Sequence, residues 1–353
     1  MGRDVMMCSQ AIERWFAAEA RDLPWRSNRT PWRSLVSEFM LQQTQVARVL
    51  ERFEPFLERF PAAKDLAVAD VQEVLSMWQG LGYYRRARNL RLAAQTIVDD
   101  FGGEVPLDVD ALRRLPGVGR YTAGSMASIV GGQPVAAVDG NVTRLLARVY
   151  CDDAMQQDPA FVRRIWSRAE ALVDACGSPP LLNEGMMELG ARVCSPASPS
   201  CGVCPLEALC GAHAAGRAAE IPPAKGRPDR GVLHQHTVVI RRRGSILLER
   251  RPEEGLWGGL WQTPAIEGGG ELSVGELVEG LDFRVEGLKR VSRLTRQLTH
   301  RTIHIYVHAA TVARGARVPQ IDGRQWVRQV DLPCLPLSSA ARAVLEISAP
   351  PMG

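Results

Sequence analysis

Two carboxylates occupy positions where the sequence could use them for acid–base chemistry. Glu38 lies in the segment VSEFMLQQT, beside the apolar residues Leu35 and Phe39. A glutamate there either faces solvent or sits in a dry pocket that raises its pKa and makes it a general acid. Asp139, in AVDGNVTRLLARVY, precedes a helical pattern. It could be an N-cap and nothing more, or it could be a carboxylate that stays ionised near amide donors and takes part in the chemistry. Two carboxylates in such contrasting surroundings are the usual means of breaking a glycosidic bond.

A second group with possible chemistry is a compact set of four cysteines. They are Cys194, Cys201, Cys204 and Cys210, in the pattern C-x6-C-x2-C-x5-C. Disulfides are disfavoured because the sequence shows no secretory pattern. Zinc more often uses two separated C-x2-C knuckles, whereas four thiolates in one loop also suit a cubane iron–sulfur cluster. On chemistry alone, zinc and iron–sulfur stay equally open.

The stretch LPGVGRYTAG, residues 115–124, joins two helical patterns through a turn that contains Gly117 and Gly119. A Gly-x-Gly turn at the start of a helix exposes backbone N–H groups that can bind phosphate. The same glycines also occur in many helix–helix turns because one residue needs a positive φ. Tyr121 follows on the far side of this turn.

The elements that must position these residues fall into two domains. Residues 1–210 show apolar spacing of three and four, which predicts an all-α domain. Residues 211–231 are rich in Ala, Pro and Gly and are expected to be a linker. Residues 232–353 contain alternating segments, which predict a smaller α+β domain. In TIHIYVHAATV the alternation puts Ile303 and Ile305 on one face, and we expect His304 and His308 on an exposed opposite face.

Composition agrees with a folded, two-domain chain. A length of 353 residues exceeds what one core usually supports, and 46% hydrophobic with 23% charged residues is typical of globular proteins. The net charge of +4 is a weak indication of a polyanionic partner. Because the three lysines are Lys64, Lys225 and Lys289, the segment between the first two contains none. No apolar run suits a membrane span and no signal-peptide pattern is present, so a cytoplasmic protein without membrane contact is expected.

Several segments resemble the MutY family of adenine DNA glycosylases, which are helix-hairpin-helix enzymes with a [4Fe-4S] cluster and a Nudix-like C-terminal domain. These segments are SEFMLQQTQV, GLGYYRRARNL, LPGVGRYTAG, VDGNVTRLLAR and NEGMMELGARVC, with LLERRPEEGLWGGLWQTP in the second domain. The resemblance implies a monomeric base-excision-repair enzyme that acts on double-stranded DNA. It would flip out adenine opposite 8-oxoguanine or guanine and hydrolyse the N-glycosidic bond. Contact of the linker with a replication or repair clamp stays open.

The resemblance also implies a role for each matching residue. Glu38 would protonate the adenine ring, Asp139 would stabilise or transiently bond the oxocarbenium-like sugar, and Asn141 would help to order the attacking water. The expected cluster ligands are Cys194, Cys201, Cys204 and Cys210. The expected DNA contacts are Arg21, Trp25, Arg26 and Glu184 around adenine, Gln43 and Tyr83 in the stack left by flipping, Gly117 and Gly119 at phosphate, and Thr299 and His300 at 8-oxoguanine.

Tyr121 bears on the type of reaction. In the related endonuclease III group a lysine occupies this position and attacks the sugar as an amine, which gives lyase activity. A tyrosine cannot form that Schiff base, and no lysine lies between Lys64 and Lys225 to substitute for it. The resemblance therefore implies a monofunctional hydrolase.

The sequence departs from the family pattern at three places. The family's Phe-Ser-His appears as Leu298-Thr299-His300, which keeps a hydroxyl and loses the aromatic contact. The first cysteine loop, SPASPS, has no basic residue, so it is not expected to contact phosphate. After Gly269 no R-E-x-x-E-E helix occurs, so Nudix hydrolysis is not expected.

Three other functions stay open beside adenine removal. One of them, a Nudix pyrophosphatase, is disfavoured by the missing R-E-x-x-E-E helix. An endonuclease III-like bifunctional glycosylase and lyase is disfavoured by Tyr121. A non-catalytic DNA-binding module with a structural metal is disfavoured because binding alone needs neither Glu38 nor Asp139.

Overall fold

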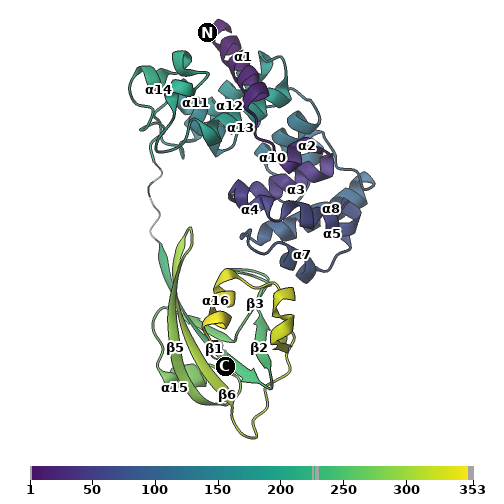
Figure 1. Ribbon diagram of the computed structural model, residues 1–353, viewed down its shortest axis with the longest axis vertical. Coiled ribbons are helices and arrows are strands. Elements are labelled where there is room, and N and C mark those ends of the chain that lie inside the picture. The colour runs from purple at the N-terminus through teal and green to yellow at the C-terminus, as the bar shows by residue number, and fades with distance from the viewer. Residues whose placement is uncertain (1, 225, 227–229, 349–353) are drawn as a thin grey trace. The chain divides into compact units, whose positions relative to one another are not determined.

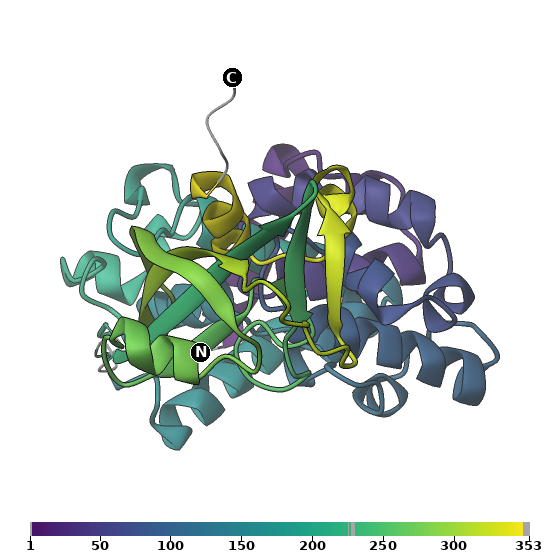
Figure 2. The ribbon, with the colours of Figure 1, turned by 90° about the horizontal axis from the view of Figure 1, so that it is seen from below.

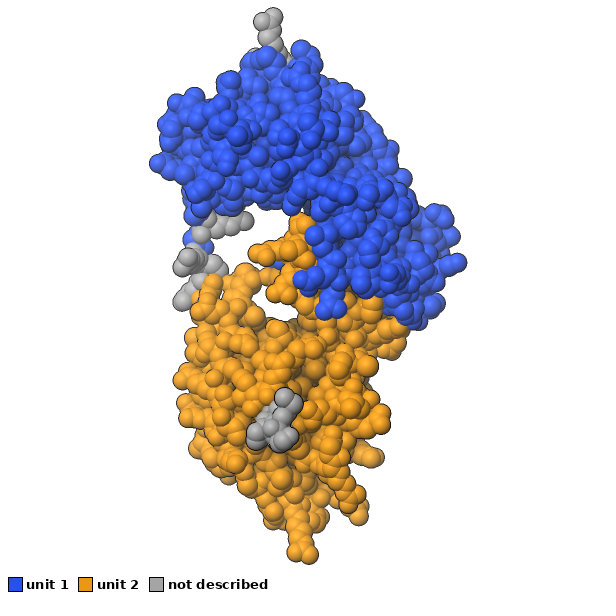
Figure 3. All heavy atoms as spheres, in the orientation of Figure 1, with its two compact units in different colours: residues 1–43, 49–68, 92–226 blue, residues 44–48, 69–91, 227–353 orange. Residues whose placement is uncertain are grey.

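The structure is a computed structural model that describes residues 2–224, 226 and 230–348 (Figure 1). The chain forms two compact units, each discontinuous in sequence (Figure 3). Unit 1 comprises residues 1–43, 49–68 and 92–226, and unit 2 comprises residues 44–48, 69–91 and 227–353. Unit 2 therefore combines the C-terminal strands with a helical segment at residues 69–91. None of the described helices is long and apolar enough to cross a membrane.

Residues 2–210 are largely helical, as the apolar spacing predicts, and one more short helix, α14, lies in the segment expected to be a linker. The elements are α1 (Gly2–Glu19), α2 (Pro24–Ser27), α3 (Pro31–Leu41), α4 (Val46–Leu50), α5 (Phe53–Arg59), α6 (Ala63–Ala67), α7 (Val71–Met77), α8 (Arg85–Phe101), α9 (Val109–Arg113), α10 (Arg120–Ser125), the π-helix η1 (Met126–Val130), α11 (Gly140–Val149), α12 (Pro159–Asp174), α13 (Pro179–Arg192), the 3₁₀ helices η2 (Cys201–Val203) and η3 (Glu207–Leu209), and α14 (Gly211–Ala214). Within unit 1, α13 packs against both α1 and α11. The buried core there includes Ile12, Leu146, Phe161 and Met186.

The hairpin that carries LPGVG is formed by α9, a tight turn and α10. Asp108 caps α9 by accepting hydrogen bonds from the N–H groups of Asp110 and Ala111. Gly117 has a φ of 83°, a left-handed conformation that a residue with a Cβ rarely adopts. Helix α10 passes directly into η1, whose wider turn bonds Gly131 N–H to the Met126 carbonyl at 3.2 Å. Such π-turns are common beside functional sites.

Helix α13 approaches α11 closely because Gly190 has no side chain. A Cβ at Gly190 would lie 2.7 Å from the Cβ of Asn141 and 2.8 Å from its carbonyl oxygen. No such pair of atoms is tolerated, so any side chain at this position would displace Asn141. The glycine therefore fixes the backbone that carries one of the predicted catalytic residues.

The C-terminal part is an α+β sheet domain, as predicted. Its elements are β1 (Gly231–Arg242), β2 (Ser245–Arg250), β3 (Trp261–Gln262), β4 (Ala265–Gly268), α15 (Val274–Glu279), β5 (Val285–Gln297), β6 (Arg301–Val312), β7 (Arg324–Arg328), η4 (Gln329–Cys334) and α16 (Ser339–Ile347). The strand order is β3-β2-β1-β6-β5, with β4 paired to β1 and β7 paired to β2. Strands β1 and β6 run parallel and β5 and β6 form an antiparallel hairpin. Figures 1 and 2 show α15 and α16 on opposite faces of this sheet.

The prediction of an exposed face at His304 and His308 is wrong for the second residue. The Ile303–Ile305 face is buried against α16, as expected. On the other face, His308 is 4% exposed and Tyr306 is 1% exposed, and only His304 is partly open. The reason is that α15 covers this face too, through Leu277, and the ring of His236 on the neighbouring strand β1 stacks 4.5 Å from that of Tyr306. Alternation alone did not reveal that both faces of the sheet are covered.

Candidate active site

Glu38 lies within α3, which begins after the N-cap Thr30 with Pro31 in its first turn. The Glu38 Oε1 accepts a hydrogen bond from the Ser125 hydroxyl at 2.7 Å. Its Oε2 is buried and accepts no hydrogen bond within the described part of the chain. Burial raises the pKa of the Glu38 carboxyl to about 7; hydrogen bonding from Ser125 and Tyr121 opposes the rise, and the negative charge of Asp139 adds to it. The structure therefore supports a dry pocket around Glu38 and not a position facing solvent.

Tyr121 is a near neighbour of Glu38 and Asp139. Burial, followed by the negative charges of Glu38 and Asp139, raises the pKa of the Tyr121 hydroxyl well above its usual value. The phenol therefore stays neutral and keeps its proton. Its hydroxyl points to the Sδ of Met187 on α13, 3.4 Å away.

Asp139 is the N-cap of α11, as the sequence predicts. Its Oδ1 accepts the Val142 N–H at 2.7 Å, and its Oδ2 accepts from the Asn141 side-chain amide at 2.9 Å. Burial raises the pKa of Asp139 above its usual value, although these hydrogen bonds oppose the rise. The two carboxyl groups thus differ in their partners: Asp139 has amide donors for both oxygens, and Glu38 has one oxygen without any.

Asn141 is held in turn by Arg144, a residue that the sequence analysis did not single out. The Arg144 Nη2 donates to the Asn141 Oδ1 and to the Gly190 carbonyl, each at 2.9 Å. Its Nε donates to the Cys194 carbonyl at 2.8 Å. A continuous chain of hydrogen bonds therefore runs from Asp139 to the first residue of the cysteine loop.

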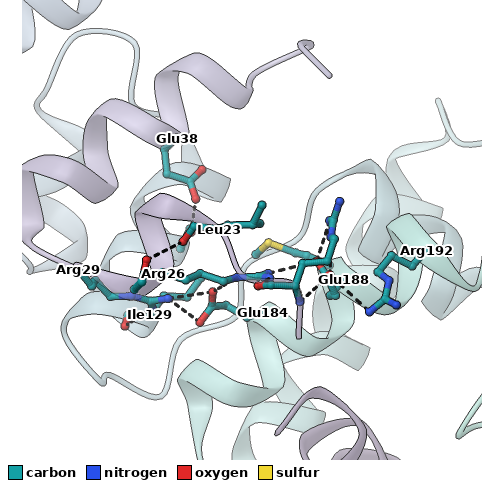
Figure 4. A network of polar contacts seen from close by, with 12 residues as sticks. Leu23, Arg26, Arg29, Glu38, Ile129, Glu184, Glu188 and Arg192 are labelled. Carbon is teal, nitrogen blue, oxygen red and sulfur yellow. Dashed lines mark hydrogen bonds and ion pairs between the residues drawn. The ribbon is translucent and has the colours of Figure 1, made fainter. Parts of the chain in front are cut away.

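An ion-pair network lies beside Glu38 and gathers most of the predicted adenine-pocket residues (Figure 4). Glu184 accepts from Arg26 Nε at 3.0 Å and from Arg29 Nη2 at 2.9 Å through each of its oxygens. The Arg29 Nη1 donates to the Ile129 carbonyl of η1 at 3.1 Å. Trp25 is 8% exposed and its ring meets that of Phe53 edge-on.

Arg21 joins the same network through Glu188, which is 2% exposed and was not predicted. Arg21 donates to both Glu188 oxygens, at 2.5 and 2.8 Å, and Arg26 Nη2 donates to Oε2 at 3.2 Å. Burial alone would raise the pKa of Glu188, but the two arginines outweigh it and hold the pKa below its usual value. Glu188 is therefore the buried anion that fixes Arg21 and Arg26.

The two residues predicted to enter the base stack both have strained backbones. Gln43 has a φ of 54° and Tyr83 a φ of 46°, the left-handed region that residues with a Cβ rarely adopt. Gln43 is exposed in unit 1, and Tyr83 is 46% exposed in unit 2. Strain of this kind is concentrated at functional sites. Thr299 and His300 are exposed in the turn between β5 and β6, in unit 2.

The four clustered cysteines line one cavity of unit 1, with roughly 360 Å³ of space that is partly open to solvent. As they stand, no three His, Cys, Asp or Glu side chains in the described residues converge closely enough to hold a metal ion. Burial, together with the neighbouring cysteines, raises the pKa of Cys204 to about 11. A metal or cluster binds cysteine as the thiolate, so four cysteines that line one cavity are a donor set that would fit such a group.

Arg148 supplies a positive charge to this cavity and organises the loop around it. The side chain is 2% exposed, and its Nη1 lies 3.2 Å from the Cys194 Sγ. Its guanidinium also donates to the carbonyls of Ser195, Pro196 and Ile221 at 2.7, 2.8 and 2.7 Å. Within the described residues Arg148 makes no ion pair with a carboxylate, so the thiol side of the cavity is its nearest site for an anion.

Comparison with known proteins agrees with this arrangement. Residues 36–171 match the model of the HhH-GPD superfamily of base excision DNA repair proteins, and residues 236–346 match the NUDIX domain. The chain is 41% identical to the adenine DNA glycosylase of Mycobacterium tuberculosis, over 63% of this chain and 72% of that protein. The chain belongs to the adenine DNA glycosylase family.

Some members of the adenine DNA glycosylase family are longer than this chain. The mouse protein is 36% identical over 74% of this chain, and the chain spans 61% of its length. Among solved structures, a thermostable thymine-DNA glycosylase superposes with a TM-score of 0.55 and 26% identity, over 60% of this chain and 98% of that one. The helical domain is thus shared with glycosylases that act on other bases.

Proposed function

We propose that this protein hydrolyses the N-glycosidic bond of adenine mispaired with 8-oxoguanine or guanine in double-stranded DNA. The observation that carries the proposal is Glu38, a carboxyl group held in a dry site with a pKa near 7 and one unpartnered oxygen. Two observations support adenine as the base that is removed. The relatives are named adenine DNA glycosylases, and an ion-pair network surrounds Glu184. DNA binding alone would not need a carboxyl group in such surroundings.

The chain's own residues account for each step of the reaction. The protonated Glu38 donates its proton to the flipped adenine, so that the base leaves as a neutral molecule. The Asp139 carboxylate stabilises the positive charge that develops on the sugar, or bonds to it transiently. Asn141 orients Asp139 and orders the attacking water. Arg21, Trp25, Arg26 and Glu184 form the adenine pocket.

We propose a [4Fe-4S] cluster as the occupant of the cysteine cavity. Cys194, Cys201, Cys204 and Cys210 would hold it, and the charge of Arg148 would balance part of the anionic cluster. When bound, the cluster would cross-link the loop and supply a one-electron redox centre. The hydrogen bonds from Arg144 would fix the loop relative to Asn141.

The DNA contacts outside the base pocket are proposals of the same kind. Gly117 and Gly119 would present backbone N–H groups to phosphate, and Gln43 and Tyr83 would fill the space left by the flipped base. Thr299 and His300 would read 8-oxoguanine on the other strand.

The assay that tests this function uses labelled duplex with adenine opposite 8-oxoguanine, analysed with and without hot alkali. We expect adenine release without strand cleavage, because Tyr121 cannot attack the sugar as an amine. Cleavage should appear only after alkali, and borohydride should not trap the protein on DNA. A matched duplex with thymine in place of adenine serves as the control.

Efficient borohydride trapping of the wild type would contradict monofunctional chemistry and favour a bifunctional lyase. Absence of adenine release from every duplex would contradict the proposed function altogether.

The rate of adenine release should follow the protonation state of the Glu38 carboxyl as pH changes. Its pKa is raised to about 7, so the acid is protonated below that pH and loses its proton above it. We expect the single-turnover rate to be flat below pH 7 and to fall with a limiting slope of about ten-fold per pH unit above it. A rate that rises from pH 7 to pH 9 would exclude Glu38 as the proton donor.

A further inference from the structure

The side chain of Asn183 on α13 is fully buried in unit 1 and connects segments that are distant in sequence. Its Oδ1 accepts the Ala137 N–H at 2.9 Å. Its Nδ2 donates to the Ser128 hydroxyl at 2.8 Å and to the Val135 carbonyl at 2.9 Å, and the Pro179 carbonyl of the same helix is a third acceptor at 3.2 Å. These partners fix the orientation of the amide, because a backbone N–H can only donate and a carbonyl can only accept.

Through Ser128, Asn183 holds the π-helix η1, which follows directly on the residue that contacts Glu38. The Ser125 hydroxyl, at the end of α10, donates to the Glu38 Oε1 at 2.7 Å, and η1 begins at the next residue. Helix η1 packs against both α3, which carries Glu38, and α13, which carries Asn183. The position of the Ser125 hydroxyl against Glu38 therefore depends on how η1 is held.

A second connection between η1 and α13 lies one residue further along each segment. Arg29 donates to the Ile129 carbonyl at 3.1 Å and to both Glu184 oxygens at 2.9 Å (Figure 4). Ile129 follows Ser128 in the chain, and Glu184 follows Asn183. Two neighbouring ties thus fix η1 to α13, a direct one through the buried amide and a bridged one through the arginine.

Through Ala137, Asn183 also holds the segment that leads to Asp139. Ala137 lies two residues before Asp139, the N-cap of α11. This segment presses closely on α10, since a Cβ at Gly124 would lie 2.3 Å from the Ala136 carbonyl oxygen. The helix that ends beside Glu38 and the segment that ends at Asp139 are therefore in direct contact, and one amide binds on both sides of that contact.

We propose that Asn183 is a positioning residue that sets the separation of Glu38 and Asp139, an inference that rests on the proposed function of these two carboxyl groups. Glu38 has to reach the adenine ring while Asp139 faces the sugar of the same nucleotide, so their separation has to match one nucleoside. A single buried amide meets this need, because its NH₂ group binds η1 and its oxygen binds the segment before Asp139. If Asn183 only held helices together, its loss would lower stability and leave the acid unchanged.

The pH above which adenine release falls is the measurement that separates these two roles. Burial and the negative charges of Asp139 and Glu184 raise the pKa of Glu38, and hydrogen bonds from Ser125 and Tyr121 lower it. A looser η1 weakens the hydrogen bond from Ser125, so we expect the break in the pH profile to move to higher pH. S125A removes that hydrogen bond directly and should move the break upward by about one pH unit, which gives the reference shift.

S128A removes the tie to η1 with little other damage, because the freed hydrogen of Asn183 still has the Pro179 carbonyl as an acceptor. It should move the break upward by about half a pH unit and lower the single-turnover rate below the break by about ten-fold. N183A should do both more strongly, and S128A decides the question if N183A does not fold. S9A is the matched control, since Ser9 is also fully buried in unit 1 and donates to the Leu172 carbonyl at 2.9 Å. S9A should lower stability and leave the break in place, whereas an unmoved break in S128A, or one that moves to lower pH, would overturn the proposal.

A second measurement needs neither DNA nor activity. With ¹³C at the side-chain carboxyl carbon of glutamate, the Glu38 signal is identified by its titration near pH 7 and by its loss in E38Q. S128A should raise the midpoint of that titration, and S9A should not. An unchanged midpoint in S128A would refute the positioning role even if the wild type releases adenine. A raised midpoint in a protein that releases no adenine would instead leave the positioning role in place and refute the proposed function.

Discussion

Replacing Glu38 by glutamine is expected to abolish adenine release while leaving duplex binding nearly intact. Glutamine keeps the shape and can still bond to Ser125, but it has no acidic proton to give to adenine. Loss of a general acid typically costs about 10²–10⁴-fold in rate, and single-turnover assays should show a loss at the upper end of this range. E54Q is the matched control, because Glu54 lies on α5 and is 45% exposed. Substantial turnover by E38Q would remove Glu38 from the acid role.

The same variant should be more stable than the wild type at alkaline pH, which separates lost chemistry from lost folding. The pKa of Glu38 is raised from 4.5 to about 7, so the folded state binds an extra proton between these pH values. The wild-type free energy of unfolding therefore falls as pH rises through that window, whereas glutamine does not titrate. Above pH 7 the gain in E38Q should be on the order of 3 kcal/mol, and below pH 4.5 it should vanish. Urea titrations at pH 8 and pH 4.5 measure the difference, and equal stabilities at pH 8 would contradict a buried carboxyl.

Patterns over a few neighbouring residues predicted the helical and strand segments and the N-cap residue of the candidate active site. Asp139 precedes a helical pattern and is indeed the N-cap of α11. The alternation around Ile303 and Ile305 correctly gave one buried face of β6. These features depend on neighbours a few residues away, which a single sequence displays directly.

The supporting residues could not be predicted because their partners are distant in sequence. Ser125 bonds to Glu38 across 87 residues, and Arg21 to Glu188 across 167. The burial of His308 was not predicted for the same reason, since its partner His236 on the neighbouring strand β1 is 72 residues away. The role of Arg148 could have been predicted from the sequence. Arg148 lies three residues after Leu145 and one before Val149, among the apolar residues of α11. An arginine on the buried face of a helix indicates a fixed partner.

Replacing that residue in R148M should remove the proposed cluster from the cysteine cavity and destabilise unit 1. Methionine fills much of the volume but leaves the carbonyls of Ser195, Pro196 and Ile221 without their donor. An orphaned buried group costs about 1–3 kcal/mol, so the total loss should be on the order of several kcal/mol. Iron per chain and the urea midpoint measure the two effects.

R164M is the matched control for Arg148, because Arg164 pairs with Asp152 and is 43% exposed, so its removal should change neither quantity greatly. An R148M protein with wild-type iron content and an unchanged midpoint would show that the loop needs no cation. In that case the hydrogen bond from Arg144 to the Cys194 carbonyl would be the remaining tie between the cysteine loop and the helix that carries Asn141.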